Sequence, residues 1–292
     1  MFLTVLKPTL RQAQIKYLQF SIKKTCRTLC FPISVLFRSL LDLHNLPSEW
    51  KHSIISPKFK SGSPSDPKNY RPISLTCTCC KVLESIIVAE LLEFLNTHKL
   101  ISKHQHGFLK LHSTTTNLLE TINDWTISLS NHKSVTIAYV DFQRAFDTIS
   151  HPKLIHKLIS YGVSGNLLFW IQSFLSNRTQ VVRITSSFSS VCGVSSGVPQ
   201  GSVLGPILFD IFINDLVDIF DGNATAKLFA DDLKLYTDIT FPSDRHNFQV
   251  QLDLLCKWST QWQLGISYSK CSILQLGSPT NFPTTHFKTH PL

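Results

Sequence analysis

The sequence predicts an α+β fold, because its strands occur as hairpins mixed with helices instead of in regular β-α alternation. The composition is that of a globular protein, with 43% hydrophobic and 16% charged residues among 292. A chain of this length can bury a full core as one large or two ordinary domains. We therefore expect a mixed fold whose sheets are largely antiparallel.

Apolar residues that recur every three or four positions predict the helices. The predicted helices span residues 31–46, 80–96, 113–130, 152–160, 166–176, 203–220 and 247–264. In the first of them the apolar face is expected to consist of Val35, Leu36, Leu40 and Leu43. In the helix over 113–130 it is expected to consist of Leu118, Leu119, Ile122 and Trp125.

Runs of β-branched and alternating apolar residues predict the strands. They cover residues 53–60, 134–142, 179–185, 187–194, 271–276 and both arms of 226–236. The run over 134–142 is the strongest, and Asp141 lies at its C-terminal end. Residues 53–60 and the segment after the turn at 61–67 predict a hairpin that carries Lys58, Lys60 and Arg71. Such a hairpin could bind phosphate, or it could be a solvated edge that lysines protect from further pairing.

The charge balance favours a polyanionic partner. Lys and Arg number 28 against 19 Asp and Glu, which gives a formal charge of +9. Nucleic acid is the first candidate for such an excess, and plain solubility is the alternative. Because the excess is basic, a local concentration of carboxylates runs against the trend and suggests a metal site.

Targeting signals are not indicated. No apolar run approaches the length of about 18 residues that a membrane span needs. The segment Met1–Leu10 reaches Lys7 and Pro8 too early for a signal-peptide core. The expectation is an intracellular protein of the cytoplasm or nucleus that does not use a membrane as a partner.

The cysteines and clustered histidines predict no metal site of their own. Neither the cluster Cys77, Cys79 and Cys80 nor the pair Cys26 and Cys30 has a matching second half of zinc-ligand spacing. Buried, reduced thiols are the preferred interpretation of these residues. Around the predicted loop 105–108, the residues His104, His106 and His112 are expected to be surface histidines.

Two adjacent carboxylates, Asp231 and Asp232, lie between the arms of the hairpin predicted over 226–236. Asp is a common turn residue, so the pair could simply be an acidic turn. Alternatively, a rigid hairpin holds two like charges that a divalent cation neutralises. Asp141 can join this pair only if its strand neighbours the hairpin in one sheet. The three carboxylates would then suit two Mg²⁺ ions, or Mn²⁺ in their place, for either polymerisation or hydrolysis of phosphodiesters.

Several short motifs occur in an order that identifies a family. They are Asn69–Leu75 (NYRPISL), Gln105–Phe108 (QHGF), Asp141–Asp147 (DFQRAFD), Ser196–Pro206 (SGVPQGSVLGP) and Phe229–Asp232 (FADD). Together they resemble the reverse transcriptase domain of non-LTR, LINE-like retrotransposons of the jockey type. The resemblance covers roughly residues 46–276. Each motif alone is weak, but five in this order are specific.

The resemblance implies a right-hand polymerase with an antiparallel palm sheet. Fingers are expected at about 46–133 and a palm at about 134–276, after an N-terminal helical extension (1–45) and before a polar tail (277–292). Implied partners are an RNA template, a DNA primer and dNTPs, with two Mg²⁺ ions as cofactors. By position, Asp141, Asp231 and Asp232 are the implied metal ligands, whereas Asp147 is expected to be structural.

The resemblance also implies residues that bind the nucleotide. Phe146 matches the position of a steric gate that excludes the ribose 2′-hydroxyl, with a core phenylalanine as the alternative. The run Phe142, Gln143, Arg144 and Ala145, which leads to Phe146, is expected to present backbone amides to the triphosphate. Lys58, Lys60 and Arg71 match the fingers hairpin that grips phosphates, and Gln200 matches the residue beside nucleotide and template. Lys270 is a candidate general acid for pyrophosphate, or a surface lysine, in a looser match where Ser267 replaces the family's usual Asn.

The ends of the chain suggest less than a full element. Relative to the family, the chain is expected to lack the upstream endonuclease domain and the primer grip and thumb that follow the polymerase. A truncated copy of the polymerase is therefore expected. One alternative is an inactive retroelement remnant that binds RNA. A metal-dependent nuclease is another, but it leaves Phe146 and the Pro-Gln-Gly turn at 199–201 unexplained.

Overall fold

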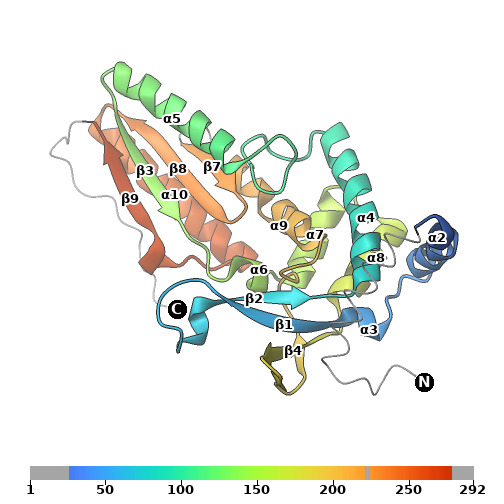
Figure 1. Ribbon diagram of the computed structural model, residues 1–292. Coiled ribbons are helices and arrows are strands. Elements are labelled where there is room, and N and C mark those ends of the chain that lie inside the picture. Colours follow the sequence, from blue (N-terminus) through green and yellow to red (C-terminus); the bar gives the residue numbers. More distant parts are fainter. Residues whose placement is uncertain (1–25, 221, 223, 278–292) are drawn as a thin grey trace. The chain divides into compact units, whose positions relative to one another are not determined.

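The computed structural model describes residues 26–220, 222 and 224–277, which form two compact units (Figure 1). The first unit combines residues up to Glu93 with Ile155–Gly205, and the second combines Phe94–Leu154 with the residues from Pro206 onward. In the described part of the chain, every helix is too short or too polar to cross a membrane.

The first unit is built on a mixed sheet with the strand order β2-β1-β4-β5, in which β6 also pairs with β4. Its strands are β1 (His52–Phe59), β2 (Tyr70–Leu75), β4 (Arg178–Ile184), β5 (Ser187–Phe188) and β6 (Cys192–Val194). Strand β1 is antiparallel to β2 and parallel to β4. The predicted basic hairpin is confirmed, since Lys58 pairs with Arg71 across β1 and β2. A short 3-10 helix, η1 (Pro67–Asn69), closes the turn between them.

Helices of the first unit are α2 (Cys26–Asp42), α3 (Ser48–Lys51) and α8 (Gly165–Leu175), while α4 (Thr78–Thr97) and α7 (His151–Ser160) continue across the unit boundaries. Helix α2 packs against α8. The predicted apolar face of this first helix is wrong in part. Phe37 and Leu40 are buried, whereas Val35, Leu36 and Leu43 are exposed. Phe37 also packs edge-on against Trp50 of α3, and these contacts cover one stripe of α2 while Val35 and Leu36 stay on its surface.

The second unit is built on an antiparallel sheet with the strand order β7-β8-β3-β9. These strands are β3 (Ser134–Val140), β7 (Thr225–Phe229), β8 (Asp232–Ile239) and β9 (Ser272–Leu276). Strand β3 pairs with β8 along its full length, from Ser134 opposite Ile239 to Val140 opposite Leu233. The hairpin predicted over 226–236 is confirmed. Its second strand, β8, pairs with β3, the strand that leads to Asp141, as the metal-site hypothesis requires.

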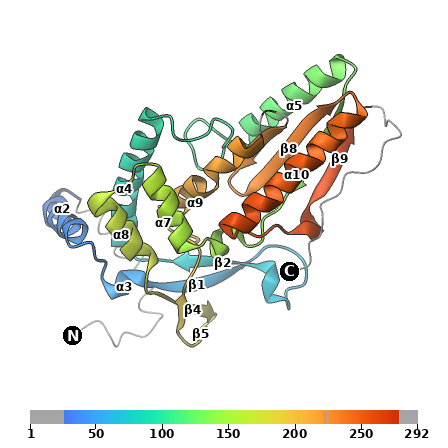
Figure 2. The ribbon, with the colours of Figure 1, turned by 180° about the vertical axis from the view of Figure 1, so that it is seen from behind.

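Both faces of this sheet are covered by helices. Helix α5 (Thr114–Ser130) lies on one face and α10 (Pro242–Trp262) on the other, as Figures 1 and 2 show. The opposed pairs Ile137–Tyr236 and Ala138–Leu235 point to opposite faces, and all four residues are buried. Short helices α6 (Ala145–Thr148) and η3 (Tyr268–Lys270) flank the sheet. The apolar run predicted as one helix over 203–220 is α9 (Gly205–Ile213) followed by the 3-10 helix η2 (Asn214–Phe220).

Helix α5 turns a polar face, not its leucines, toward the sheet. Leu118, Leu119 and Ile122 are 49%, 62% and 44% exposed, whereas Asn117 and Thr121 are buried. The predicted apolar face is therefore wrong, except that Trp125 packs edge-on against Tyr236. The cause lies in the opposing strands, whose polar side chains need partners once α5 covers them. The hydrogen-bonded pairs between strand side chains and α5 side chains are Lys227–Glu120, Lys234–Thr121, Tyr236–Asp124 and Asp238–Ser128.

The cysteines are reduced, but they are less buried than expected. All cysteines whose side chains are described are free thiols. Only Cys80 among them is buried, while Cys30 and Cys192 are exposed. The prediction of burial is right for Cys80 and wrong for Cys30, Cys77 and Cys79, and the side chain of Cys26 lies outside the described residues.

The polar packing of α5 predicts an unusual response to a hydrophobic substitution. Thr121→Val keeps the side-chain shape but removes a hydroxyl that accepts from Lys234 Nζ at 3.1 Å and donates to the Asn117 carbonyl at 2.6 Å. We expect a loss of about 1–3 kcal/mol in the free energy of unfolding, because a partly buried ammonium and a buried carbonyl each lose a partner. The same change at the exposed Thr126 should cost less than about 0.5 kcal/mol. Urea unfolding of both variants checks this, and equal losses would contradict it.

Candidate functional site

The hairpin of β7 and β8 ends in a two-residue turn that carries the acidic pair. Phe229 pairs with Asp232, which leaves Ala230 and Asp231 as the central residues. Ala230 has φ +53°, whereas Asp231 does not have a positive φ. A positive φ at the first central position alone is the sign pattern of a type II′ turn, whose twist suits a hairpin. Glycine normally occupies this position, so the alanine is held in a backbone conformation that costs free energy.

Three aspartate positions come together at the ends of two paired strands. Asp141 follows Val140, Asp232 precedes Leu233, and these two apolar residues are directly opposite each other. Asp231 is half-buried in the turn and Asp232 is exposed. In the described ranges, however, His, Cys, Asp and Glu side chains do not form a group of three that is ready to hold a metal ion. The backbone thus brings the three positions together, and the side chains do not converge further.

Lys270 lies beside the first of these carboxylates. Its Nζ is 3.4 Å from Asp141 Oδ1, and the two side chains are 64% and 37% exposed. A pair this open to solvent contributes about 0–1 kcal/mol. The preceding chain brings the lysine here, because Ser267 N–H donates to the Asp141 carbonyl at 2.8 Å and Phe142 bridges to Ile266. The structure therefore places Lys270 beside Asp141, and its role as a general acid stays a prediction.

Part of the backbone after Asp141 is hydrogen-bonded to the segment that precedes Lys270. The Gln143 amide donates to the Gly265 carbonyl at 2.7 Å, and Gln143 Nε2 donates to the Ile266 carbonyl at 2.9 Å. Phe142 is buried beneath Trp258. Arg144 has φ +44° and caps α6. The Gln143 amide therefore donates within the protein, contrary to the expectation that it faces a triphosphate. The amides from Arg144 onward stay a prediction.

Phe146 belongs to an aromatic cluster while it remains partly exposed. Its ring stacks on Phe209 with centroids 4.4 Å apart and meets Phe108 edge-on at 6.1 Å. The preceding Ala145 is buried. One ring face is thus fixed by packing, as a core residue requires, and part of the side chain stays accessible, as a steric gate requires. The gate stays a prediction.

The basic hairpin of the first unit places like charges side by side. Lys58 and Arg71 are directly opposite on β1 and β2, and both side chains are exposed, as is Lys60 in the turn. Like charges in this relation destabilise a sheet. An anion between or above them would relieve the repulsion, so this geometry suits a phosphate.

The Pro-Gln-Gly turn of the first unit contacts the Ser74 backbone, and the segment that follows the turn binds Glu84. Ser74 N–H donates to the Gln200 carbonyl at 2.6 Å, and Gly201 lies so close that a Cβ would be 2.6 Å from the Ser74 carbonyl oxygen. The buried carboxylate of Glu84 accepts from the Val203 and Leu204 amides at 2.7 and 2.9 Å. Burial raises the pKa of Glu84. Sequence reasoning missed this glutamate, since it lies within an ordinary helical pattern.

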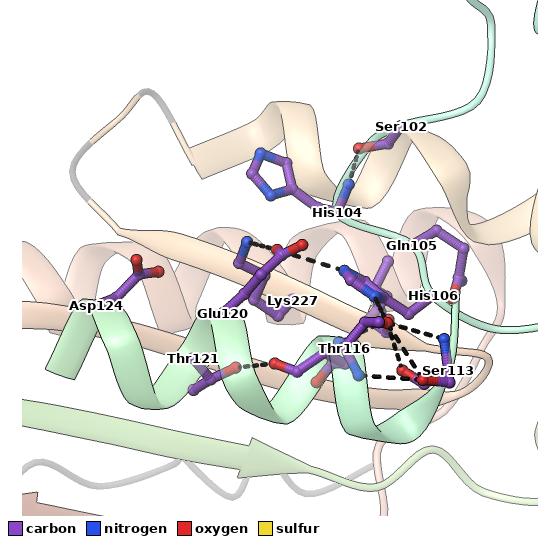
Figure 3. Close-up of polar contacts among 12 residues, drawn as sticks. Ser102, His104, Gln105, His106, Ser113, Thr116, Glu120, Thr121, Asp124 and Lys227 are labelled. Carbon is purple, nitrogen blue, oxygen red and sulfur yellow. Dashed lines mark hydrogen bonds and ion pairs between the residues drawn. The ribbon is translucent and has the colours of Figure 1, made fainter. Parts of the chain in front are cut away.

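The loop that contains Gln105 and His106 is buried, so the expectation of a surface histidine is wrong for His106. His106 Nδ1 is 3.0 Å from Thr116 Oγ1, and Nε2 is 3.5 Å from Glu120 Oε2 (Figure 3). Glu120 also binds Lys227 Nζ at 2.5 Å, so one carboxylate serves both a strand and the loop. Burial lowers the pKa of His106 and also that of His104.

A comparison with protein families matches residues 57–287 to the family described as reverse transcriptase (RNA-dependent DNA polymerase). The chain belongs to the reverse transcriptase family. This confirms the resemblance that the ordered motifs predicted. Polymerases of this family generally use divalent metal ions.

Relatives with curated descriptions come from insect mobile elements. The chain is 30% identical to the RNA-directed DNA polymerase from mobile element jockey of Drosophila melanogaster, over 85% of this chain and 28% of that protein. It is 31% identical to the jockey polymerase of Drosophila funebris, over 82% and 27%. The chain thus spans less than a third of the length of these relatives.

Solved structures confirm the predicted α+β reverse transcriptase fold. A telomerase from Candida tropicalis, truncated from its C-terminal domain, superposes with a TM-score of 0.59 over 81% of this chain and 52% of that one. A Candida albicans telomerase gives 0.57 over 84% and 46%. Sequence identities of 12% and 13% make this a likeness of fold alone.

The buried His106 and the partly buried His104 predict a loss of stability in mild acid. Because burial lowers the pKa of His104 and His106 in the folded state, the unfolded chain binds more protons just below the ordinary pKa of 6.5. Stability should therefore fall as the pH decreases through about 6.5. The groups that face His106 are Glu120, Lys227 and His112.

Urea midpoints at pH 7.5 and 5.5 measure this effect. His106→Gln should make the midpoint depend less on pH, whereas the same change at the exposed His246 of α10 should leave the dependence as it is. An identical dependence in wild type and His106→Gln would contradict the assignment.

Proposed function

We propose that this chain is the RNA-directed DNA polymerase domain of a non-LTR retrotransposon, which adds dNTPs to a primer 3′-hydroxyl. One observation carries the proposal: in a member of the reverse transcriptase family, Asp141 and Asp232 lie at the adjoining ends of two paired strands, with Asp231 in the turn. Such a set of carboxylates is what in-line transfer between phosphate oxygens requires.

The donor set fits two Mg²⁺ ions, or Mn²⁺ in their place. Asp141, Asp231 and Asp232 supply only oxygen ligands, which these hard cations prefer. Their backbone positions adjoin at the end of β3 and β8, so a cation would relieve repulsion between the like charges held there. When bound, the ions would neutralise charge on the phosphates and on the attacking hydroxyl. The role of the protein is to hold the three carboxylates at fixed backbone positions.

Basic and backbone groups would bind the triphosphate. Lys58 and Arg71 face each other across the basic hairpin, with Lys60 in its turn, and their charges would be balanced by phosphate oxygens. The amides from Arg144 to Phe146 would add neutral donors, and buried Phe142 would fix the backbone that presents them. Gln200, partly exposed on a turn that Ser74 and Glu84 hold, would contact the nucleotide and template.

Lys270 would move a proton. Its ammonium is 3.4 Å from Asp141 and largely exposed. A lysine in this position can donate a proton to the departing pyrophosphate. The excess of basic residues, +9 overall, would favour an RNA template and a DNA primer as partners through their phosphates.

A second candidate function is RNA binding without synthesis, as expected of an inactive retroelement remnant. The observation that favours it is that three potential metal ligands do not converge as a group in the described ranges. Primer extension distinguishes the two functions, because a remnant would bind template and leave the primer unextended.

Removal of the carboxylates should abolish synthesis without unfolding the protein. Asp231→Asn and Asp232→Asn are each expected to reduce single-turnover primer extension on an RNA template by at least about 10³-fold, since charge stabilisation by metals contributes several kcal/mol. Asp218→Asn, at an exposed aspartate of the same unit, is the matched control and should keep full activity. Extension that survives in the double variant would rule out the mechanism.

Phe146→Val tests the steric gate against the core interpretation. If the ring excludes the 2′-hydroxyl, the preference for dNTPs over rNTPs should fall by about 10–100-fold, as expected for one pocket contact. A core role would lower the rates with both nucleotides equally. Phe108→Val, in the same aromatic cluster, controls for lost packing and should leave the preference unchanged.

A further inference from the structure

Residues 104–106 add a short parallel segment to the edge of the carboxylate hairpin. Gln105 bridges to Leu228 of β7, and the Leu228 amide donates to the His104 carbonyl at 2.8 Å. The His106 amide donates back to the Leu228 carbonyl at 2.9 Å. This segment therefore occupies the edge of β7 that β8 leaves unpaired, and it ends beside the turn.

The Gln105 side chain binds both backbone polar groups of one turn residue. Its Oε1 accepts from the Ala230 amide at 2.9 Å, and its Nε2 donates to the Ala230 carbonyl at 3.3 Å. The same Oε1 accepts from the Gly107 amide at 2.7 Å, which orients the carboxamide. Gln105 is only 1% exposed, so water cannot replace these bonds. The contact with Ala230 lies directly before Asp231.

The turn needs such a contact because its backbone is strained. Ala230 has φ +53° and is 5% exposed. A non-glycine residue in this region persists only where its surroundings hold it there. Within the turn, the two hydrogen bonds of the Gln105 carboxamide both go to the backbone of Ala230. They fix the peptide groups on either side of it, and thereby the direction in which Asp231 and Asp232 leave the turn.

Gly107 provides the space for this approach. A Cβ at residue 107 would lie 2.4 Å from the Ala230 nitrogen and 2.9 Å from its Cα. Neither backbone atom can yield without moving the turn. Glycine is thus required here by the close contact of two backbones.

The clamp that residues 104–107 form on Ala230 is anchored to the rest of the unit by hydrogen bonds and one ion pair, which Figure 3 shows. His106 contacts Thr116 and Glu120 of α5, and Glu120 also binds Lys227 on β7. Asn117 of α5 donates to the Leu228 carbonyl at 3.1 Å. Residues 104–106 cannot shift along β7 without breaking these contacts, so the backbone that carries Gln105 is held in place.

We propose that Gln105 is a positioning residue, which sets the Ala230 backbone so that Asp231 and Asp232 are presented to divalent cations. The inference rests on the proposed function in that these carboxylates are taken as the metal ligands. A residue outside the hairpin would then determine how strongly the hairpin binds metal.

The test compares Gln105→Leu with wild type by two readouts that do not depend on catalysis. Hydrogen exchange of the Ala230 amide should become about tenfold faster, since its acceptor is lost. Affinity for Mn²⁺, followed by electron paramagnetic resonance of the free ion, should fall by about 10–100-fold, as is typical when a residue that orients ligands is removed. Gln251→Leu, at an equally buried glutamine of α10, is the matched control and should change neither.

Gln105→Glu provides a signature that a purely structural role would not give. A protonated glutamic acid can still accept from the Ala230 amide and donate to its carbonyl, whereas the ionised form loses the donor and adds a charge. Burial raises the pKa of such a carboxyl. Exchange at the Ala230 amide relative to wild type should therefore become faster as the pH rises in Gln105→Glu, and it should not in Gln105→Leu.

Gly107→Ala tests the clamp without altering the glutamine. It should accelerate exchange at Ala230 and weaken Mn²⁺ binding, whereas Gly193→Ala, where a Cβ meets nothing within 4 Å, should do neither. This variant keeps the proposal testable if Gln105→Leu does not fold.

The outcomes separate the two proposals. Unchanged exchange and unchanged Mn²⁺ affinity in the folded Gln105 and Gly107 variants overturn the positioning role, even if wild type polymerises. A wild type that binds Mn²⁺ but extends no primer overturns the proposed function alone, while the two readouts still decide the clamp. A wild type with no affinity for Mn²⁺ overturns both.

Discussion

The pairing of β3 with β8 is the constraint on which the rest of the second unit depends. Its register places Val140 opposite Leu233, and therefore Asp141 beside Asp232. A slip by one residue would turn every side chain of a strand to the opposite face and separate the carboxylates. Burial on both faces resists such a slip, because Ile137 and Ala138 point in opposite directions and both are fully buried. The hydrophobic packing of this sheet is thus what fixes the acidic site.

A second constraint is electrostatic. One face of the sheet carries Lys227, whose side chain is nearly buried, and there it pairs with Glu120, which also contacts His106. This ion pair contributes little net stability, because removing the lysine charge from water offsets much of its attraction to a carboxylate that is 47% exposed. What it can supply is orientation, since α5 rotated about its axis would leave Lys227 without a partner. The same carboxylate holds the loop that carries Gln105. The polar layer beneath α5 therefore connects the helix, the edge strand and the turn of the acidic pair.

The parts of this structure that follow from local pattern could be predicted from the sequence. The carboxylate hairpin, the basic hairpin and the strand that ends at Asp141 each have a turn signal or a run of β-branched residues. The face of α5 could not be predicted, because its periodicity places Leu118 and Ile122 inward, and the reason for the opposite orientation lies on strands about a hundred residues away. The burial of His106 and the contact of Gln105 with the turn could not be predicted for the same reason. Their partners are backbone and side-chain groups distant in sequence, and periodicity carries no information on buried polar contacts.

The turn itself shows why such distant contacts belong at this site. Glycine at position 230 would adopt the positive φ without strain, but it would also increase the conformational freedom of the unfolded chain and of the turn. Alanine narrows the accessible conformations, and the Gln105 carboxamide compensates for the strain with bonds to both of its backbone polar groups. Two adjacent carboxylates repel each other, so a flexible turn would let them separate. A turn held by contact keeps its charges at the position that the sheet register assigns to them.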